Sequence, residues 1–236
     1  MMSHMISVSM QTSEIAESFD QELAQRLAPV GFQKCPAGHF TNYLAPDVSG
    51  HFGYVLHKDR RTSEVWAWPV AGVRLHAVER LLCELSDKEF DAHGSFTIGG
   101  PVGFLMPRLD QGEWAVDSVA DVPRVAAAVV AACKTYVLPF MQCHMSLEDA
   151  VKGMSPEQLG GGHDGARLAV TYLLLGDMGK ALQVVDYQLA HFAKGSYPGA
   201  SEFRKLAGNL RDRTIVSSRH VGDRTSGFLN AGAGVE

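Results

Sequence analysis

Residues 50–76, GHFGYVLHKDRRTSEVWAWPVAGVRLH, decide the fold of this chain. Phe52, Tyr54 and Leu56 recur at every second position, which is the spacing of a half-buried strand. A charged turn follows at residues 58–61, and a second strand rich in aromatic residues comes after it. The stretch therefore predicts a β-hairpin.

The second strand of this hairpin carries two large aromatic side chains. Trp66 and Trp68 are two residues apart, so both rings lie on one face. Two such rings are either buried in a core or form a binding hot spot. Because Pro69 cannot donate a ladder hydrogen bond, we expect this strand to lie at a sheet edge or to end there.

Helices are predicted on both sides of the hairpin. Residues 13–30 repeat apolar side chains every four positions after Ser13, a candidate N-cap. Residues 75–85 predict a short second helix, and a third is expected to begin at Asp121 and to stop at Pro139.

From residue 146 onward the apolar pattern is helical. Residues 166–176 and 178–194 predict a helical hairpin, and residues 203–210 extend the pattern into a last helix. The fold class is therefore α+β: an N-terminal, mostly antiparallel sheet with packed helices, followed by an all-helical C-terminal subdomain.

This pattern divides the chain into four segments. We expect residues 1–12 to be disordered or an expression remnant, and residues 13–145 to form the α+β domain. Residues 146–213 form the helical subdomain, and residues 214–236, rich in glycine and small polar residues, form a flexible tail.

Composition limits the classes of protein to consider. A net charge of −5 over 236 residues argues against nucleic-acid binding, which usually needs a basic field. The longest apolar run, residues 125–133, is shorter than the roughly 20 residues that span a bilayer. The four cysteines lack CxxC spacing and no secretory signal is evident, so we expect a cytoplasmic protein with reduced thiols.

A glycine-rich segment at residues 160–165 matches GxGxxG. A dinucleotide site also needs a strand directly before that motif, and here the preceding residues favour helix or turn. We therefore interpret the segment as a flexible loop with Asp164 as a helix N-cap, and predict no cofactor.

Histidines offer a second hypothesis, since His51 and His57 share one face of the predicted strand. With His39 on a neighbouring strand, three imidazoles would come together, a set that zinc accepts. No HxH, HExxH or paired-cysteine spacing supports this arrangement, so ordinary surface or core histidines are the expected state and no metal ligand is assigned.

Catalytic motifs are absent from the sequence, and we predict a protein that is not an enzyme. There is no GxSxG elbow, and the neighbours Cys143 and His144 do not define a dyad by adjacency alone. Asp87, Glu89 and Asp91 form an acidic cluster that is a solvated loop, a paired-carboxylate site or a docking patch.

The helical hairpin resembles a single tetratricopeptide-type unit. Since an array of such repeats needs about three copies, one copy is expected to pack on the rest of the chain. The matching residues are Ala169, Tyr172, Leu175, Gly176, Asp177, Ala181, Leu182 and Leu189.

The order of elements over the first 140 residues also resembles a known pattern. The matching features are an opening helix that ends at Gly31-Phe32, meandering strands, a helix over residues 73–85, strands at Thr97 and Trp114, and a helix from Asp121 to Leu138-Pro139-Phe140. Small bacterial α+β domains of unknown function among polymorphic-toxin immunity proteins share this pattern. The resemblance implies a non-enzymatic factor that neutralises a toxin by covering its active site.

A basic toxin domain is our candidate for such a partner. Five residues are our candidates for contact with it: Trp66, Asp87, Glu89, Asp91 and Trp114. Two alternatives stay open. One is a small-molecule-binding domain or enzyme with a pocket between sheet and helices, and the other is a helical adaptor. The sequence does not give the oligomeric state.

Overall fold

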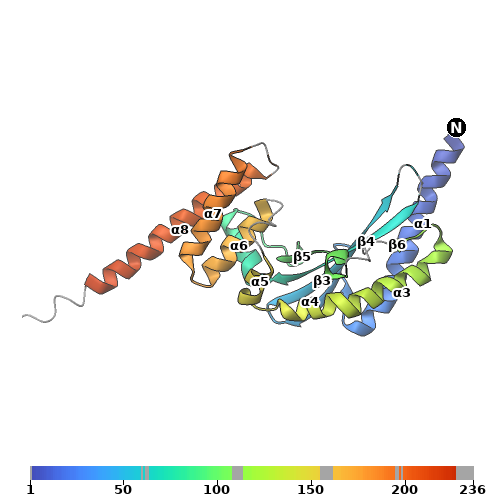
Figure 1. Ribbon diagram of the computed structural model, residues 1–236, viewed down its shortest axis with the longest axis horizontal. Coiled ribbons are helices and arrows are strands. Elements are labelled where there is room, and N and C mark those ends of the chain that lie inside the picture. The colour runs from blue at the N-terminus through green and yellow to red at the C-terminus, as the bar shows by residue number, and fades with distance from the viewer. Residues whose placement is uncertain are drawn as a thin grey trace, which may run out of the picture. The chain divides into compact units, whose positions relative to one another are not determined.

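A computed structural model describes residues 2–59, 61, 64–107, 114–154, 162–194, 197 and 199–226. The chain forms two compact units (Figure 1). The N-terminal unit comprises Met1–Ala77 and Asp91–Gly153, and the C-terminal unit comprises Val78–Phe90 and Met154–Glu236. The division differs from the predicted boundaries, because residues 78–90 pack with helices that follow them by more than seventy residues.

An antiparallel sheet forms the centre of the N-terminal unit. Its strands follow the order β1-β2-β3-β4-β5, and β6 also pairs with β4. The strands are β1 (Gln33–Lys34), β2 (Phe40–Ala45), β3 (Val48–Lys58), β4 (Val65–Leu75), β5 (Ile98–Pro101) and β6 (Trp114–Ala115). The predicted hairpin is confirmed, since β3 and β4 pair from Val48↔Leu75 to Lys58↔Val65. The predicted α+β fold class is confirmed as well.

The edge position predicted from Pro69 is wrong. Strand β4 pairs with β3 along its whole length and with β5 and β6 on its other side. Trp68 and Pro69 fall between the last residue paired with β6, Ala67, and the first paired with β5, Val70. Because no ladder is formed there, the N–H that proline lacks is not needed on that side.

Helices cover one face of the sheet, which we name the packed face. Helix α1 (Met2–Leu27) contacts α3 (Val122–Ala132), and both helices lie along the same face (Figure 1). The ring of Phe19 in α1 meets that of Tyr54 in β3 edge-on, with 4.9 Å between centroids. Since α1 begins at Met2, the predicted N-cap at Ser13 is wrong, and the helix includes residues that were expected to be disordered.

The helix that begins near Asp121 does not stop at Pro139, contrary to the prediction. After α3, a π-helical turn (Cys133–Val137) leads directly into α4 (Leu138–Cys143). A π turn bonds each N–H one residue further back than an α-helix does, which accommodates the missing N–H and the bulk of the proline ring.

The resulting continuous helix, Val119–Cys143, is long and apolar enough to cross a membrane by length and composition. A core helix passes the same test, and Val125, Val129 and Val137 are buried in this unit. Gly50 of β3 allows α4 to approach the packed face closely, because a Cβ at this position would lie 2.5 Å from the Met141 sulfur. The unit also contains α5 (Leu147–Gly153) and the short helices η1 (Ala28–Val30), η2 (Val102–Leu105) and η3 (Val119–Asp121).

The C-terminal unit is helical. It contains most of α2 (His76–Leu85) together with α6 (Gly162–Leu174), α7 (Met178–Phe192) and α8 (Ala200–Ser226). The predicted helical hairpin is confirmed as α6 and α7. One face of α8 is buried and carries Phe203, Leu206 and Leu210. The backbone of α8 continues to Ser226, past the boundary predicted at residue 213, and residues 227–236 lie outside the described residues.

Candidate functional site

The face of the sheet opposite the packed face carries the candidate site, and we name it the open face. Side chains of paired residues on neighbouring strands share a face. Phe52 and its partner Ala71 point to the helices and are buried. Side chains alternate between the two faces along each strand, so the odd-numbered residues of β3 and their partners in β4 point to the open face. Val55 lies beside Trp68 there, and His57 lies beside Trp66.

These four residues, Val55, His57, Trp66 and Trp68, form what we call the aromatic patch. Val55 is 56% exposed and Trp68 is 44% exposed, while Trp66 is half-buried. The rings of His57 and Trp68 lie 6.2 Å apart. The face of a sheet that meets water normally carries polar side chains. Exposed apolar side chains that cluster on such a face therefore indicate an interaction surface.

A second group on the open face is polar and buried, and we name it the histidine cluster. The hydroxyl oxygen of Ser49 lies 3.0 Å from Nε2 of His51 and 3.0 Å from Nε2 of His76. The His39 and His51 rings stack with 4.7 Å between centroids. The Ser49 side chain is 1% exposed, so this Ser–His contact, which resembles a nucleophile with its base, is closed to a substrate.

Arg74 closes the histidine cluster by holding a loop over it. Its guanidinium donates hydrogen bonds to the carbonyl oxygens of Asp91 and Ser95. The ring of Phe96 covers Gly72, where an added Cβ would lie 2.3 Å from it. Residues 91–96 therefore cover this end of the open face, and the aromatic patch lies further along the strands.

Burial lowers the pKa values of two imidazoles of the cluster, those of His51 and His39. Burial first, and then the nearby charges of His39, Arg74, His76 and His93, lower the pKa of His51 from 6.5 to about 3. Burial, with His93 and Arg74, also lowers the pKa of His39. Of the three histidines considered as a zinc set, His39 and His51 meet, whereas His57 lies beside Trp68. The described residues contain no group of three His, Cys, Asp or Glu side chains placed to hold a metal.

The lowered pKa of His51 predicts a pH-dependent stability. Between about pH 3 and 6.5 the unfolded chain binds a proton at His51 that the folded chain does not, so the free energy of unfolding falls as the pH falls. We expect a loss of about 2 kcal/mol between pH 7.5 and pH 5 from this residue. Denaturant unfolding across this range measures it.

The control for this experiment is the exposed histidine of the same strand. His51→Asn should reduce the pH dependence, whatever it does to stability at pH 7.5, and should reduce it more than His57→Asn does. An unaltered slope in His51→Asn would show that another group is responsible.

The structure places the five predicted contact residues in different surroundings. Trp66 belongs to the aromatic patch, but Trp114 pairs with the buried Ala67 and therefore lies on the packed face, half-buried. Asp87 and Glu89 belong to the C-terminal unit and Asp91 to the N-terminal unit.

Two of the three acidic residues, Asp87 and Asp91, have contacts of their own. Asp87 forms an ion pair with Lys205 at 2.8 Å, and the Asp91 carboxylate accepts a hydrogen bond from the His93 N–H at 2.8 Å. Val55 was missed as a site residue, although its alternation with His57 in the sequence carried the signal. Trp68 was considered with Trp66 as part of a hot spot but was not among the five contact candidates.

The remaining motifs show no reactive geometry in the described part of the chain. Helix α6 begins at Gly162, so Asp164 lies in its first turn and the N-cap predicted there is wrong. Residues 160–161 of the GxGxxG match lie outside the described residues. The His144 Nδ1 lies 2.8 Å from the Phe140 carbonyl and so donates to its own helix, while Cys143 is exposed.

Comparisons with family models, with curated proteins and with solved structures give no match to this chain. The aromatic patch is therefore assessed from the chemistry of its own residues.

Proposed function

We propose that this is a non-enzymatic, protein-binding protein whose binding site is the aromatic patch. The observation that supports it is the exposure of Val55 and Trp68 side by side on a sheet face that the helices of the N-terminal unit leave uncovered. Tryptophan is the residue most enriched among binding hot spots, because it buries a large area with few rotatable bonds.

The surroundings of the patch suit a protein partner. The histidine cluster and the packed face fix both strands, so the exposed side chains are held on a rigid support before binding, which lowers the entropic cost of association. The described turn residues beside the patch include Lys58, Asp59 and Arg61, so a charged rim borders the apolar centre.

A narrower proposal is that the partner is a bacterial toxin domain whose active site this surface covers in the cytoplasm. The resemblance of the first 140 residues to immunity-protein domains supports it, and a net charge of −5 favours a basic partner. The proposal makes Trp66 and Trp68 the anchors that enter the toxin surface.

The test is affinity capture of the tagged chain from its host at low and at high salt, with mass spectrometry of what stays bound. We expect one stoichiometric protein that survives high salt, and at least about 30-fold weaker binding to Trp68→Ala. The matched control is Phe104→Ala, since Phe104 is 85% exposed in the same unit but is not part of the patch.

Two results would overturn the proposal. One is a partner that Trp68→Ala and Trp66→Ala bind as tightly as the natural chain does. The other is the absence of a stoichiometric partner at either salt concentration. Inhibition of the captured protein's activity by the natural chain would support the narrower proposal, and its absence would remove it.

A further inference from the structure

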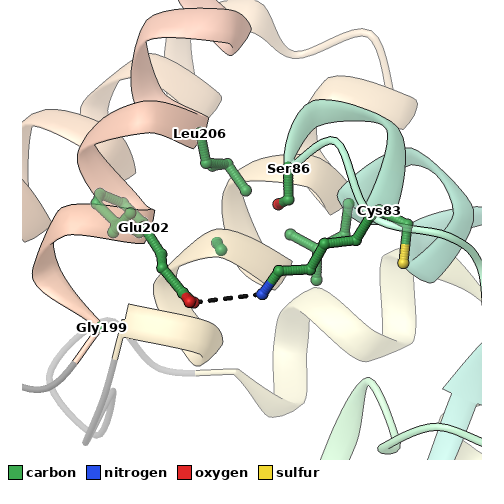
Figure 2. Close-up of a pocket in the computed structure, with 9 residues that line it drawn as sticks. Cys83, Ser86, Gly199, Glu202 and Leu206 are labelled. Atoms are coloured by element: carbon green, nitrogen blue, oxygen red, sulfur yellow. Dashed lines mark hydrogen bonds and ion pairs between the residues drawn. The ribbon is translucent and has the colours of Figure 1, made fainter.

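A cavity of about 110 Å³ lies within the C-terminal unit, between α2, α6 and α8 (Figure 2). Its walls are mostly apolar, with Leu82 and Cys83 from α2, Ala166 from α6, and Phe203 and Leu206 from α8. In Figure 2 the side chain of Leu206 points into this space, so an apolar group that entered would be removed from water.

Two opposite charges border the opening of this cavity. The Lys88 Nζ lies 3.4 Å from the Glu202 Oε2, as the dashed line in Figure 2 shows. Both side chains are more than half exposed, so their mutual attraction is weak and each remains available to a ligand.

The backbone fixes the two points from which the Lys88 and Glu202 side chains extend. Lys88 follows the C-terminus of α2, where its N–H donates to the Cys83 carbonyl and the Asp87 N–H donates to that of Glu84, with Asp87 at φ +52°. This is a Schellman termination, which sets the direction of the chain after the helix. Glu202 lies in the first turn of α8, where the helix dipole favours a carboxylate.

We propose that this cavity binds a free α-amino acid with an aliphatic side chain. The α-ammonium would pair with Glu202, the α-carboxylate with Lys88, and the side chain would fill the apolar space beneath. The two ligand charges are attached to one carbon atom, as close together as the two protein charges that would receive them.

Charge balance selects this class of ligand over its neighbours. An aliphatic carboxylate that binds Lys88 would break its ion pair with Glu202 and leave the Glu202 carboxylate without a cation. An aliphatic amine that binds Glu202 would likewise leave the Lys88 ammonium without an anion. A peptide end carries only one of the two charges. A free amino acid would replace the Lys88–Glu202 ion pair with two ion pairs, one to each side chain. Every charge at the opening then has a partner.

Isothermal titration calorimetry of the full chain tests this inference with a ligand series. Each methylene that enters the cavity should tighten binding about fourfold. Leucine should therefore bind at least about tenfold tighter than alanine. We expect 4-methylpentanoate, which lacks the ammonium, and 3-methylbutylamine, which lacks the carboxylate, each to bind at least tenfold more weakly than leucine.

Three surface variants locate the binding site. Lys88→Met and Glu202→Gln should each weaken leucine binding at least tenfold, and both positions are exposed enough that the unit should still fold. Lys205→Met is the control, since Lys205 is an exposed lysine of α8 that pairs with Asp87 and does not line the cavity.

The inference would be overturned by any of three results. These are no leucine binding at millimolar concentration, equal binding of 4-methylpentanoate, or full binding by Lys88→Met. None of them bears on the protein-binding proposal, because the cavity and the aromatic patch share no residue.

Discussion

Replacement of Arg167 by methionine is expected to destabilise the C-terminal unit by about 3–5 kcal/mol. The Arg167 guanidinium binds the Glu79 carboxylate through two contacts, Nε to Oε1 at 2.8 Å and an Nη to Oε2 at 3.3 Å. Both side chains are nearly buried, at 12% and 5% exposure. Loss of the guanidinium leaves a carboxylate in the interior, where its desolvation is costly.

Denaturant unfolding followed by far-ultraviolet circular dichroism measures this loss, since the C-terminal unit is helical. The matched control is Arg211→Met, which removes an exposed ion pair with Asp186 and should cost less than about 1 kcal/mol. The double variant Glu79→Met with Arg167→Met should regain most of the lost stability, because two apolar side chains replace the pair. A double variant as unstable as Arg167→Met alone would contradict the explanation.

Replacement of Phe19 by alanine should cost the N-terminal unit about 3–5 kcal/mol. The Phe19 side chain is fully buried between α1 and the sheet, where its ring meets that of Tyr54. Its removal forfeits the transfer free energy of the ring and leaves a cavity that the strands cannot close. Tryptophan fluorescence is a suitable probe, because all three tryptophans of the chain lie in this unit.

Phe104→Ala is the control for this experiment, as it makes the same chemical change at a position that is 85% exposed. It should change the free energy of unfolding by no more than about 0.5 kcal/mol. A loss below 1 kcal/mol in Phe19→Ala would contradict the packing of α1 on the sheet.

Several features of the candidate site were predictable, and each depends on local periodicity. The alternation of Phe52, Tyr54 and Leu56 predicted which face of β3 meets the helices. The spacing of Trp66 and Trp68 placed both on the other face, although the sequence did not show that this face stays uncovered. Exposure depends on which elements pack where, and no residue spacing specifies that.

Pro69 and Pro139 show where predictions from local sequence fail. Pro69 is tolerated inside the sheet because the partners of β4 leave a gap beside it, and Pro139 inside a helix because a π turn precedes it. The expectation that proline ends a strand or a helix failed at both positions, because the neighbouring backbone does not need the N–H that proline lacks. The presence of a proline in the sequence does not reveal that arrangement.

By itself the sequence determined the classes of element: a β-hairpin, helices on both sides of it and a helical hairpin near the end, because periods of 2 and 3.6 are local properties of the chain. Only the tertiary structure decided which elements join. It grouped Val78–Phe90 with the C-terminal helices and gathered Ser49, His51 and His76 into one buried cluster. It also placed Lys88 against Glu202, 114 positions away. Such contacts depend on long-range burial and charge, which the order of residues does not display.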